Sequence, residues 1–135
     1  MSPDARHFAL SKARLEQARN CLTASYSLMD LALHKDAANR SYYCVFHALR
    51  AVLALDGFDS KKHSGVIAEF QRRYIKSGVF ATSFSKVIES AFTVRGKSDY
   101  EDFYVISKAD VSAQLENAKA FLSAVETYVS SLQTP

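Results

Sequence analysis

Apolar residues recur along the chain at three- and four-residue steps, the period of an α-helix with one buried face. The clearest stretch runs from Asp36 to Asp56, and its apolar positions are Tyr42, Val45, Phe46, Leu49, Val52 and Leu53. Asp36 has the side chain of a helix N-cap, and Gly57 supplies a stop because glycine readily adopts the left-handed conformation that ends helices. We therefore predict a helix over residues 36–56 and take it as the central element.

A first helix is predicted from about residue 3 or 4 to residue 29, followed by a short connection over 31–35. Its apolar stripe consists of Leu15, Ala18, Leu22, Tyr26 and Met29. We expect its charged side chains to face water; they are Arg6, Lys12, Arg14, Glu16 and Arg19.

The second half of the chain predicts three more helices. One spans about 64–76 and ends at Ser77-Gly78, and another spans 83 to about 94 and leads into a charged loop over 95–102. Ser107 followed by Asp110 is a capping box that opens the last helix. The apolar positions of that helix follow a four-three rhythm: Val111, Leu115, Ala118, Leu122, Val125, Val129 and Leu132.

Composition supports an all-α interpretation. The two prolines are Pro3 and Pro135, so nothing interrupts long helices between them. With 135 residues, 48% of them hydrophobic, the chain can bury one core without disulfides or metals. We predict an up-and-down bundle of about five helices forming a single domain over residues 1–135. The net charge of +3 permits contact with a polyanion without requiring it.

Cys21 and Cys44 stand alone in apolar helical patterns, so both are expected to be small buried hydrophobes rather than a bridge or a metal site. The chain has no apolar run typical of a signal peptide or a membrane span, which favours a cytoplasmic protein. It also has no metal-ligand spacing, no glycine-rich phosphate loop and no nucleophile arranged with a base. We therefore expect no metal and no cofactor.

Arg40 and His47 are the first candidates for chemistry. They lie two helical turns apart, about 10 Å along the axis, on the side of the helix opposite the apolar stripe, with Tyr43 between them. A histidine exchanges protons near neutral pH and an arginine stabilises negative charge, which suits metal-independent RNA cleavage by the 2′-hydroxyl. The alternative is structural, with His47 packed between helices and Arg40 paired with an acid.

Two further polar groups have both a functional and a structural interpretation. Lys62 and His63 stand at the start of a predicted helix, where they form either a phosphate-binding corner or an ordinary solvated first turn. Arg95, Asp99 and Tyr100 form a polar cluster in the predicted charged loop. That cluster is either part of a site or a loop held by an ion pair.

Three motifs in order carry a family resemblance: AANRSYYCVFHA over 37–48, KHSGVI over 62–67 and RGKSDY over 95–100. Together they resemble the HEPN domain family, in particular its small stand-alone prokaryotic members. The resemblance implies a homodimeric helical bundle, often encoded with a minimal nucleotidyltransferase as a toxin–antitoxin pair. Active members are metal-independent endoribonucleases whose arginine and histidine meet in the dimer cleft.

Carried onto this sequence, the resemblance makes Arg40 and His47 the catalytic candidates. The candidates for binding RNA or nucleotide are then Asn39, Tyr43, Lys62, His63, Arg95, Asp99 and Tyr100. Two other interpretations remain open: a non-catalytic subunit that binds nucleotide or RNA beside a nucleotidyltransferase partner, and a helical oligomerisation module.

Overall fold

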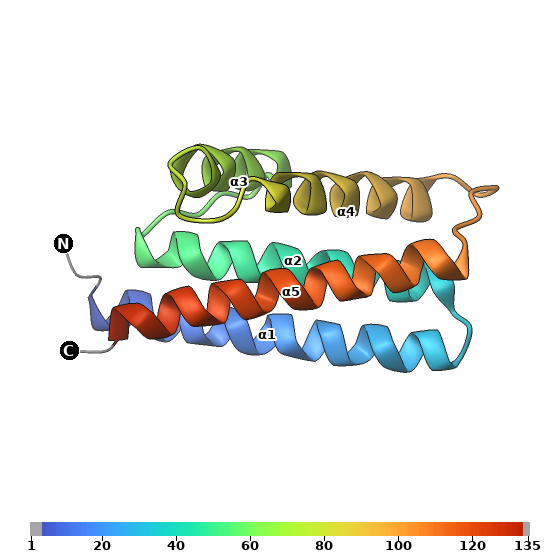
Figure 1. The fold of residues 1–135 in the computed structure, drawn as a ribbon, viewed down its shortest axis with the longest axis horizontal. Coiled ribbons are helices and arrows are strands. Elements are labelled where there is room, and N and C mark those ends of the chain that lie inside the picture. Colours follow the sequence, from blue (N-terminus) through green and yellow to red (C-terminus); the bar gives the residue numbers. More distant parts are fainter. Residues whose placement is uncertain (1–3, 134–135) are drawn as a thin grey trace.

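The structure, a computed structural model, describes residues 4–133. In this range the chain forms five α-helices and one π-helical turn, and no strand. The elements are α1 (Ala5–Asp30), α2 (His34–Leu55), α3 (His63–Phe70), the π-turn η1 (Gln71–Ile75), α4 (Ser83–Tyr100) and α5 (Lys108–Gln133). The long helices run up and down beside one another, with α3 and α4 forming the upper layer in Figure 1. The predicted all-α up-and-down bundle is confirmed.

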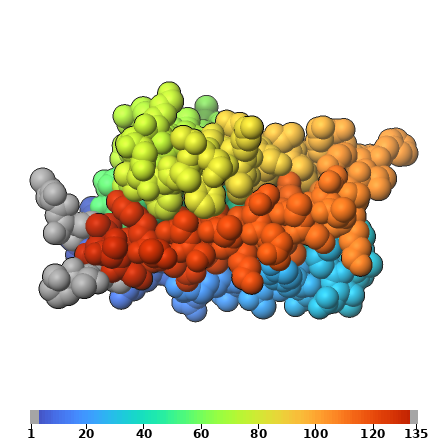
Figure 2. Space-filling view, viewed as in Figure 1, coloured from blue at the N-terminus to red at the C-terminus, as the bar shows by residue number. Residues whose placement is uncertain are grey.

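The central position belongs to α2, which packs against α1, α4 and α5. Its predicted stripe is buried, with Tyr42 and Leu53 each only 1% exposed. Small residues extend the burial around the helix: Ala37, Ala38, Cys44, Ala48 and Ala51 are all 0% exposed. These short side chains let neighbouring helices approach closely on more than one side, so most of α2 lies in the core. In Figure 2, α5 covers the middle of the molecule between the upper layer and α1.

The prediction that α2 begins at Asp36 is wrong. The helix begins at His34, after Leu33, and Asp36 lies within its first turn. Ala32 takes the left-handed conformation (φ 59°), which reverses the chain sharply enough for the helix to begin earlier. The predicted stop is right, since Leu55 is the last residue of α2 and Gly57 has φ 72°.

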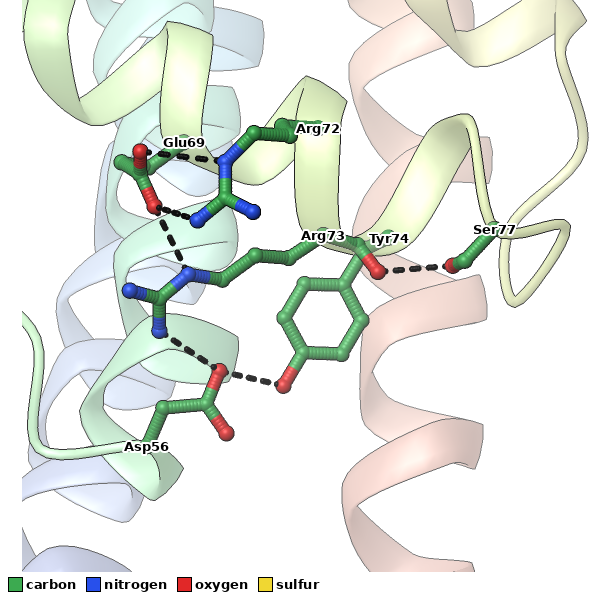
Figure 3. Close-up of polar contacts among 6 residues, drawn as sticks. All are labelled: Asp56, Glu69, Arg72, Arg73, Tyr74 and Ser77. Carbon is green, nitrogen blue, oxygen red and sulfur yellow. Dashed lines mark hydrogen bonds and ion pairs between the residues drawn. The ribbon is translucent and has the colours of Figure 1, made fainter.

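The third predicted helix changes its hydrogen bonding midway. It is α-helical from His63 to Phe70 and then widens into the π-turn η1, where Tyr74 and Ile75 are buried. Figure 3 shows what fastens this turn: Asp56 at the end of α2 accepts a hydrogen bond from Tyr74 Oη (2.7 Å) and pairs with Arg73 Nη1 at 3.4 Å. The turn is thereby tied to the end of the central helix.

Glu69 completes the network in Figure 3. It accepts hydrogen bonds from Arg72 Nη2 at 2.8 Å and from Arg73 Nε at 2.7 Å, both within one turn of the helix. Ser77 Oγ donates to the carbonyl of Arg73, close to Gly78, whose φ of 85° ends the segment as predicted.

The prediction of a charged loop over 95–102 is also wrong for most of its length. The helix α4 continues through Tyr100, and the Arg95–Asp99 ion pair joins residues one turn apart, which supports this last part of the helix. The connection to α5 is therefore residues 101–107. Ser107 Oγ accepts a hydrogen bond from the N–H of Asp110 at 3.1 Å, as a capping residue should.

Arg14 departs furthest from its predicted surroundings. It was expected to face water, but its side chain is only 8% exposed. Its guanidinium donates to the carbonyl of Arg50 (3.2 Å) and to Asp59 Oδ2 (2.9 Å), which satisfies the buried charge. At the ends of the predicted stripes, Tyr26 and Leu132 are 36% and 42% exposed rather than buried.

Two predictions about the apolar residues can be checked directly. Cys21 and Cys44 are both buried free thiols, as expected. Among residues 4–133, none of the helices is both long and apolar enough to cross a membrane.

Candidate functional site

The middle of α2, the first residue of α3 and the end of α4 meet on one side of the bundle. Seven of the predicted site residues are connected there by direct contacts: Asn39, Arg40, Tyr43, His47, His63, Arg95 and Asp99. We call this group the Tyr43 cluster. The helical period brings its α2 members onto one face, and packing of α4 against α2 adds the rest.

Tyr43 lies at the centre of the cluster. Arg95 Nη2 donates a hydrogen bond to its hydroxyl at 3.1 Å. The guanidinium carbon of Arg40 lies 4.9 Å from the ring centroid, within the range of a cation–π interaction. Two cationic groups are therefore held around one partly buried tyrosine.

Asn39 orients the charged groups. Its Oδ1 accepts hydrogen bonds from Arg40 Nε (3.0 Å) and Nη2 (2.7 Å), while its Nδ2 donates to Asp99 Oδ1 at 3.2 Å. Asp99 Oδ2 also lies 3.0 Å from Arg95 Nε. Asp99 thus balances the charge of Arg95, whereas Arg40 has a neutral amide as its hydrogen-bond partner.

His47 is half-buried, with its ring centroid 5.9 Å from that of Tyr43. Its Nδ1 is buried and has no hydrogen-bond partner in the described part of the chain. Burial lowers the pKa of His47 to about 4, and the positive charges of Arg50 and Arg40 add to the effect. The imidazole is consequently neutral at physiological pH and can accept a proton.

His63 is fixed by two aromatic residues of α2. Its Nδ1 lies 2.8 Å from the hydroxyl of Tyr42, and its ring stacks on Phe46 with centroids 4.0 Å apart. Burial, then Arg95 and Arg50, lower the pKa of His63. The sequence pattern assigns Tyr42 and Phe46 to the core alone, and nothing in their spacing signals that they also hold a histidine 21 positions beyond Tyr42.

A pocket of about 470 Å³ opens beside His63. Its lining consists of Phe46, Arg50, Asp59, Ser60, Lys61 and His63. Arg50 and the buried Arg14 both pair with Asp59, at 3.2 and 2.9 Å. Two arginines and a lysine against one carboxylate leave this region positive. Sequence reasoning missed Asp59 because it lies in a link between helices and one of its partners, Arg14, is 45 positions away.

Two of the predicted site residues lie at the edge of the Tyr43 cluster or beyond it. Tyr100 is 77% exposed and lies at the edge, where its ring centroid is 5.9 Å from the guanidinium carbon of Arg95. Lys62 is an exposed residue immediately before α3, next to the pocket. Within residues 4–133, no group of three His, Cys, Asp or Glu side chains is arranged to hold a metal ion.

The chain is thus an all-α bundle whose central helix presents a neutral histidine among arginines and aromatic rings. The HEPN domain model matches residues 11–128, and the protein belongs to this family. An UPF0332 protein of Thermotoga maritima is 31% identical over 87% of this chain and 89% of its own length. The protein named Putative toxin MJ0605 of Methanocaldococcus jannaschii is 33% identical over 66% of each chain.

A solved structure has the same fold. The crystal structure of ST0689, an archaeal HEPN homologue, superposes with a TM-score of 0.62 over 88% of this chain and 97% of that one, at 16% identity. At that identity the likeness concerns the arrangement of the helices.

Proposed function

We propose that the protein is a toxin-type HEPN endoribonuclease that cleaves RNA without a metal ion, with His47 and Arg40 as its catalytic residues. The observation that carries this proposal is the arrangement around Tyr43, where a neutral histidine and an arginine with no carboxylate partner among residues 4–133 contact the same ring. The relative named Putative toxin MJ0605 supports the toxin-type role.

In the proposed reaction, neutral His47 accepts the proton of the RNA 2′-hydroxyl while that oxygen attacks the adjacent phosphorus. The O2′–P bond forms and the P–O5′ bond breaks, giving a 2′,3′-cyclic phosphate and a 5′-hydroxyl. Arg40 stabilises the negative charge that accumulates on the phosphorane oxygens. Arg95 is less available for this task because Asp99 balances its charge.

HEPN domains commonly dimerise, and we propose that two copies pair so that the Tyr43 clusters border the dimer cleft. We also propose a minimal nucleotidyltransferase as the partner that restrains the toxin. Pairing would place the positive groups of two chains along one groove, which suits a polyanion such as single-stranded RNA.

The test is cleavage of a mixed-sequence single-stranded RNA with EDTA present throughout. We expect wild type to release 2′,3′-cyclic phosphate ends and to have a mass of about twice 15.0 kDa by light scattering. His47→Ala should lower the rate on the order of 10² to 10⁴-fold, the usual worth of a positioned base, and Arg40→Ala by a comparable factor. The fold should persist in both variants, which circular dichroism checks.

His34→Ala is the matched control because His34 is the first residue of the same helix, about 20 Å along the axis from His47. It should cleave at the wild-type rate. Inert wild type, or mutants that cleave equally well, would return Arg40 and His47 to a structural role.

The second candidate function is a non-catalytic subunit that binds a nucleotide. The pocket beside His63 favours it, because Arg50 and Lys61 line a space of about 470 Å³ that also includes the aromatic ring of Phe46. Equilibrium binding of a nucleotide by a protein that cleaves no RNA would select this function over the first.

A further inference from the structure

Given the proposed RNA cleavage, on which this inference rests, we propose that His63 is a second catalytic residue, the general acid that protonates the leaving 5′ oxygen. Cleavage by the 2′-hydroxyl requires two proton transfers, one from the attacking oxygen and one to the departing oxygen. His47 can perform one of them. The structure holds a second imidazole against the same two aromatic rings.

Both histidines contact Tyr43 and Phe46. The ring centroids of His47 and His63 each lie 5.9 Å from that of Tyr43, and they lie 6.2 and 4.0 Å from that of Phe46. Two imidazoles therefore share one small aromatic platform, and cleavage needs two proton carriers near one phosphodiester. Arg40 lies against the same platform through Tyr43.

The imidazole of His63 is oriented by a buried hydroxyl. Tyr42 is 1% exposed, and its Oη lies 2.8 Å from His63 Nδ1 while the two rings stack with centroids 5.9 Å apart. Stacking on Phe46 fixes the plane of the ring. Because Nδ1 is occupied, Nε2 is the nitrogen left for substrate; it has no hydrogen-bond partner within residues 4–133, and the ring lines the pocket.

Tyr42 can hold His63 in both of its protonation states. Burial raises the pKa of Tyr42 well above its ordinary value, so the hydroxyl keeps its proton at neutral pH. It then donates to Nδ1 of neutral His63 or accepts from Nδ1–H of the imidazolium. The orientation of Nε2 is therefore the same before and after a proton leaves it.

The atoms balance across the step. The proton from O2′ goes to His47, the O2′–P bond forms, the P–O5′ bond breaks and the proton on His63 Nε2 goes to O5′. Afterwards His47 is protonated and His63 is neutral, and exchange with water restores both. General-acid action needs a proton on both nitrogens of His63, and the nearby positive charges of Arg50 and Arg95 disfavour that cation. Lys61 and a protonated His47 act in the same direction. The carboxylate of Asp59 and the negative charge of the bound phosphodiester favour it.

The decisive experiment replaces the leaving oxygen. A dinucleotide with a 5′-bridging sulfur expels a thiolate, which leaves without being protonated. We expect His63→Ala to cleave ordinary RNA on the order of 10² to 10⁴-fold more slowly than wild type. With the sulfur substrate its deficit should shrink to less than about tenfold, whereas His47→Ala should stay slow on both substrates because the 2′-hydroxyl still needs a base.

Two further variants guard against a change in folding. His63→Gln keeps a polar planar side chain that cannot act as an acid, so it should behave as His63→Ala does. Tyr42→Phe keeps the buried ring and removes the hydroxyl that holds His63. It should lower the rate on ordinary RNA by about tenfold and shift the alkaline limb of the pH–rate profile, where the general acid loses its proton.

The outcomes separate the two proposals. If wild type is active and the His63 variants lose the same factor on both substrates, His63 is a structural residue and the general acid lies elsewhere. If wild type cleaves neither substrate, the proposed RNA cleavage fails and the role of His63 fails with it.

Discussion

Acidification from pH 7.5 to 5.0 should destabilise this protein through His47, before its carboxylates titrate. The pKa of His47 is about 4 in the folded protein, against about 6.5 in an unfolded chain. Between these values the unfolded state binds the proton more readily than the folded state does. Stability from the neutral histidine is therefore fully present above pH 6.5 and is lost as the pH falls toward 4.

The size of the effect follows from the same two values. At pH 5.0 the linkage relation gives a loss of roughly 2 kcal/mol relative to pH 7.5. The ring is only half-buried, so solvent screening reduces the expected loss to about 1 kcal/mol. The lowered pKa of His63 acts in the same direction, which makes a variant comparison necessary.

The assay is urea unfolding of wild type and His47→Gln at pH 7.5 and 5.0. The wild-type free energy of unfolding should fall by about 1 kcal/mol more than that of the variant, because glutamine does not titrate. His34→Gln, at the start of the same helix and outside the Tyr43 cluster, should follow wild type. Equal losses in wild type and His47→Gln would show that His47 is not held neutral in the folded protein, and would remove the argument for its role as a base.

Three substitutions test the packing that supports the site. Asp59→Asn removes the carboxylate that pairs with the nearly buried Arg14 and should lower the free energy of unfolding, measured in urea, by about 2 kcal/mol. This loss is smaller than that for a fully buried ion pair because Asp59 is half exposed. A loss below about 0.5 kcal/mol would contradict that account. Gly57→Ala should cost about 1–2 kcal/mol, since its φ is +72° and the new Cβ would lie 3.1 Å from the ring of His7. Gly96→Ala, in α4 with nothing within 4 Å, should instead gain about 0.5–1 kcal/mol, and equal melting temperatures for the two alanine variants would refute both.

Hydropathy predicted the helices well because their apolar positions obey the helical period, and it failed where one residue's partner decides the structure. The helical period cannot reveal that Arg14 pairs with Asp59, 45 positions further along the chain, so Arg14 looked like a surface residue. Charge density between 95 and 100 suggested a loop, yet the segment is helical and Arg95 and Asp99 form an ion pair one turn apart within it. Likewise, the buried apolar positions of the predicted third helix continue through the π-turn at Tyr74, so their period does not reveal the change in hydrogen bonding.

The candidate site was predictable as far as it lies on one helix. Arg40, Tyr43 and His47 share a face of α2 by spacing alone, and their contacts agree with that expectation. The bond between Tyr42 and His63 joins two helices, so it depends on a docking geometry that no local pattern encodes. Family resemblance named His63 without indicating what orients it.

The burial of α2 also sets how the site can move. Its backbone amides are covered by α1, α4 and α5, so their hydrogen exchange requires opening of the whole bundle rather than fraying of one segment. We therefore expect Arg40, Tyr43 and His47 to lie on a slowly exchanging part of the molecule. A regulator cannot switch this surface off by melting it locally, and must instead cover it.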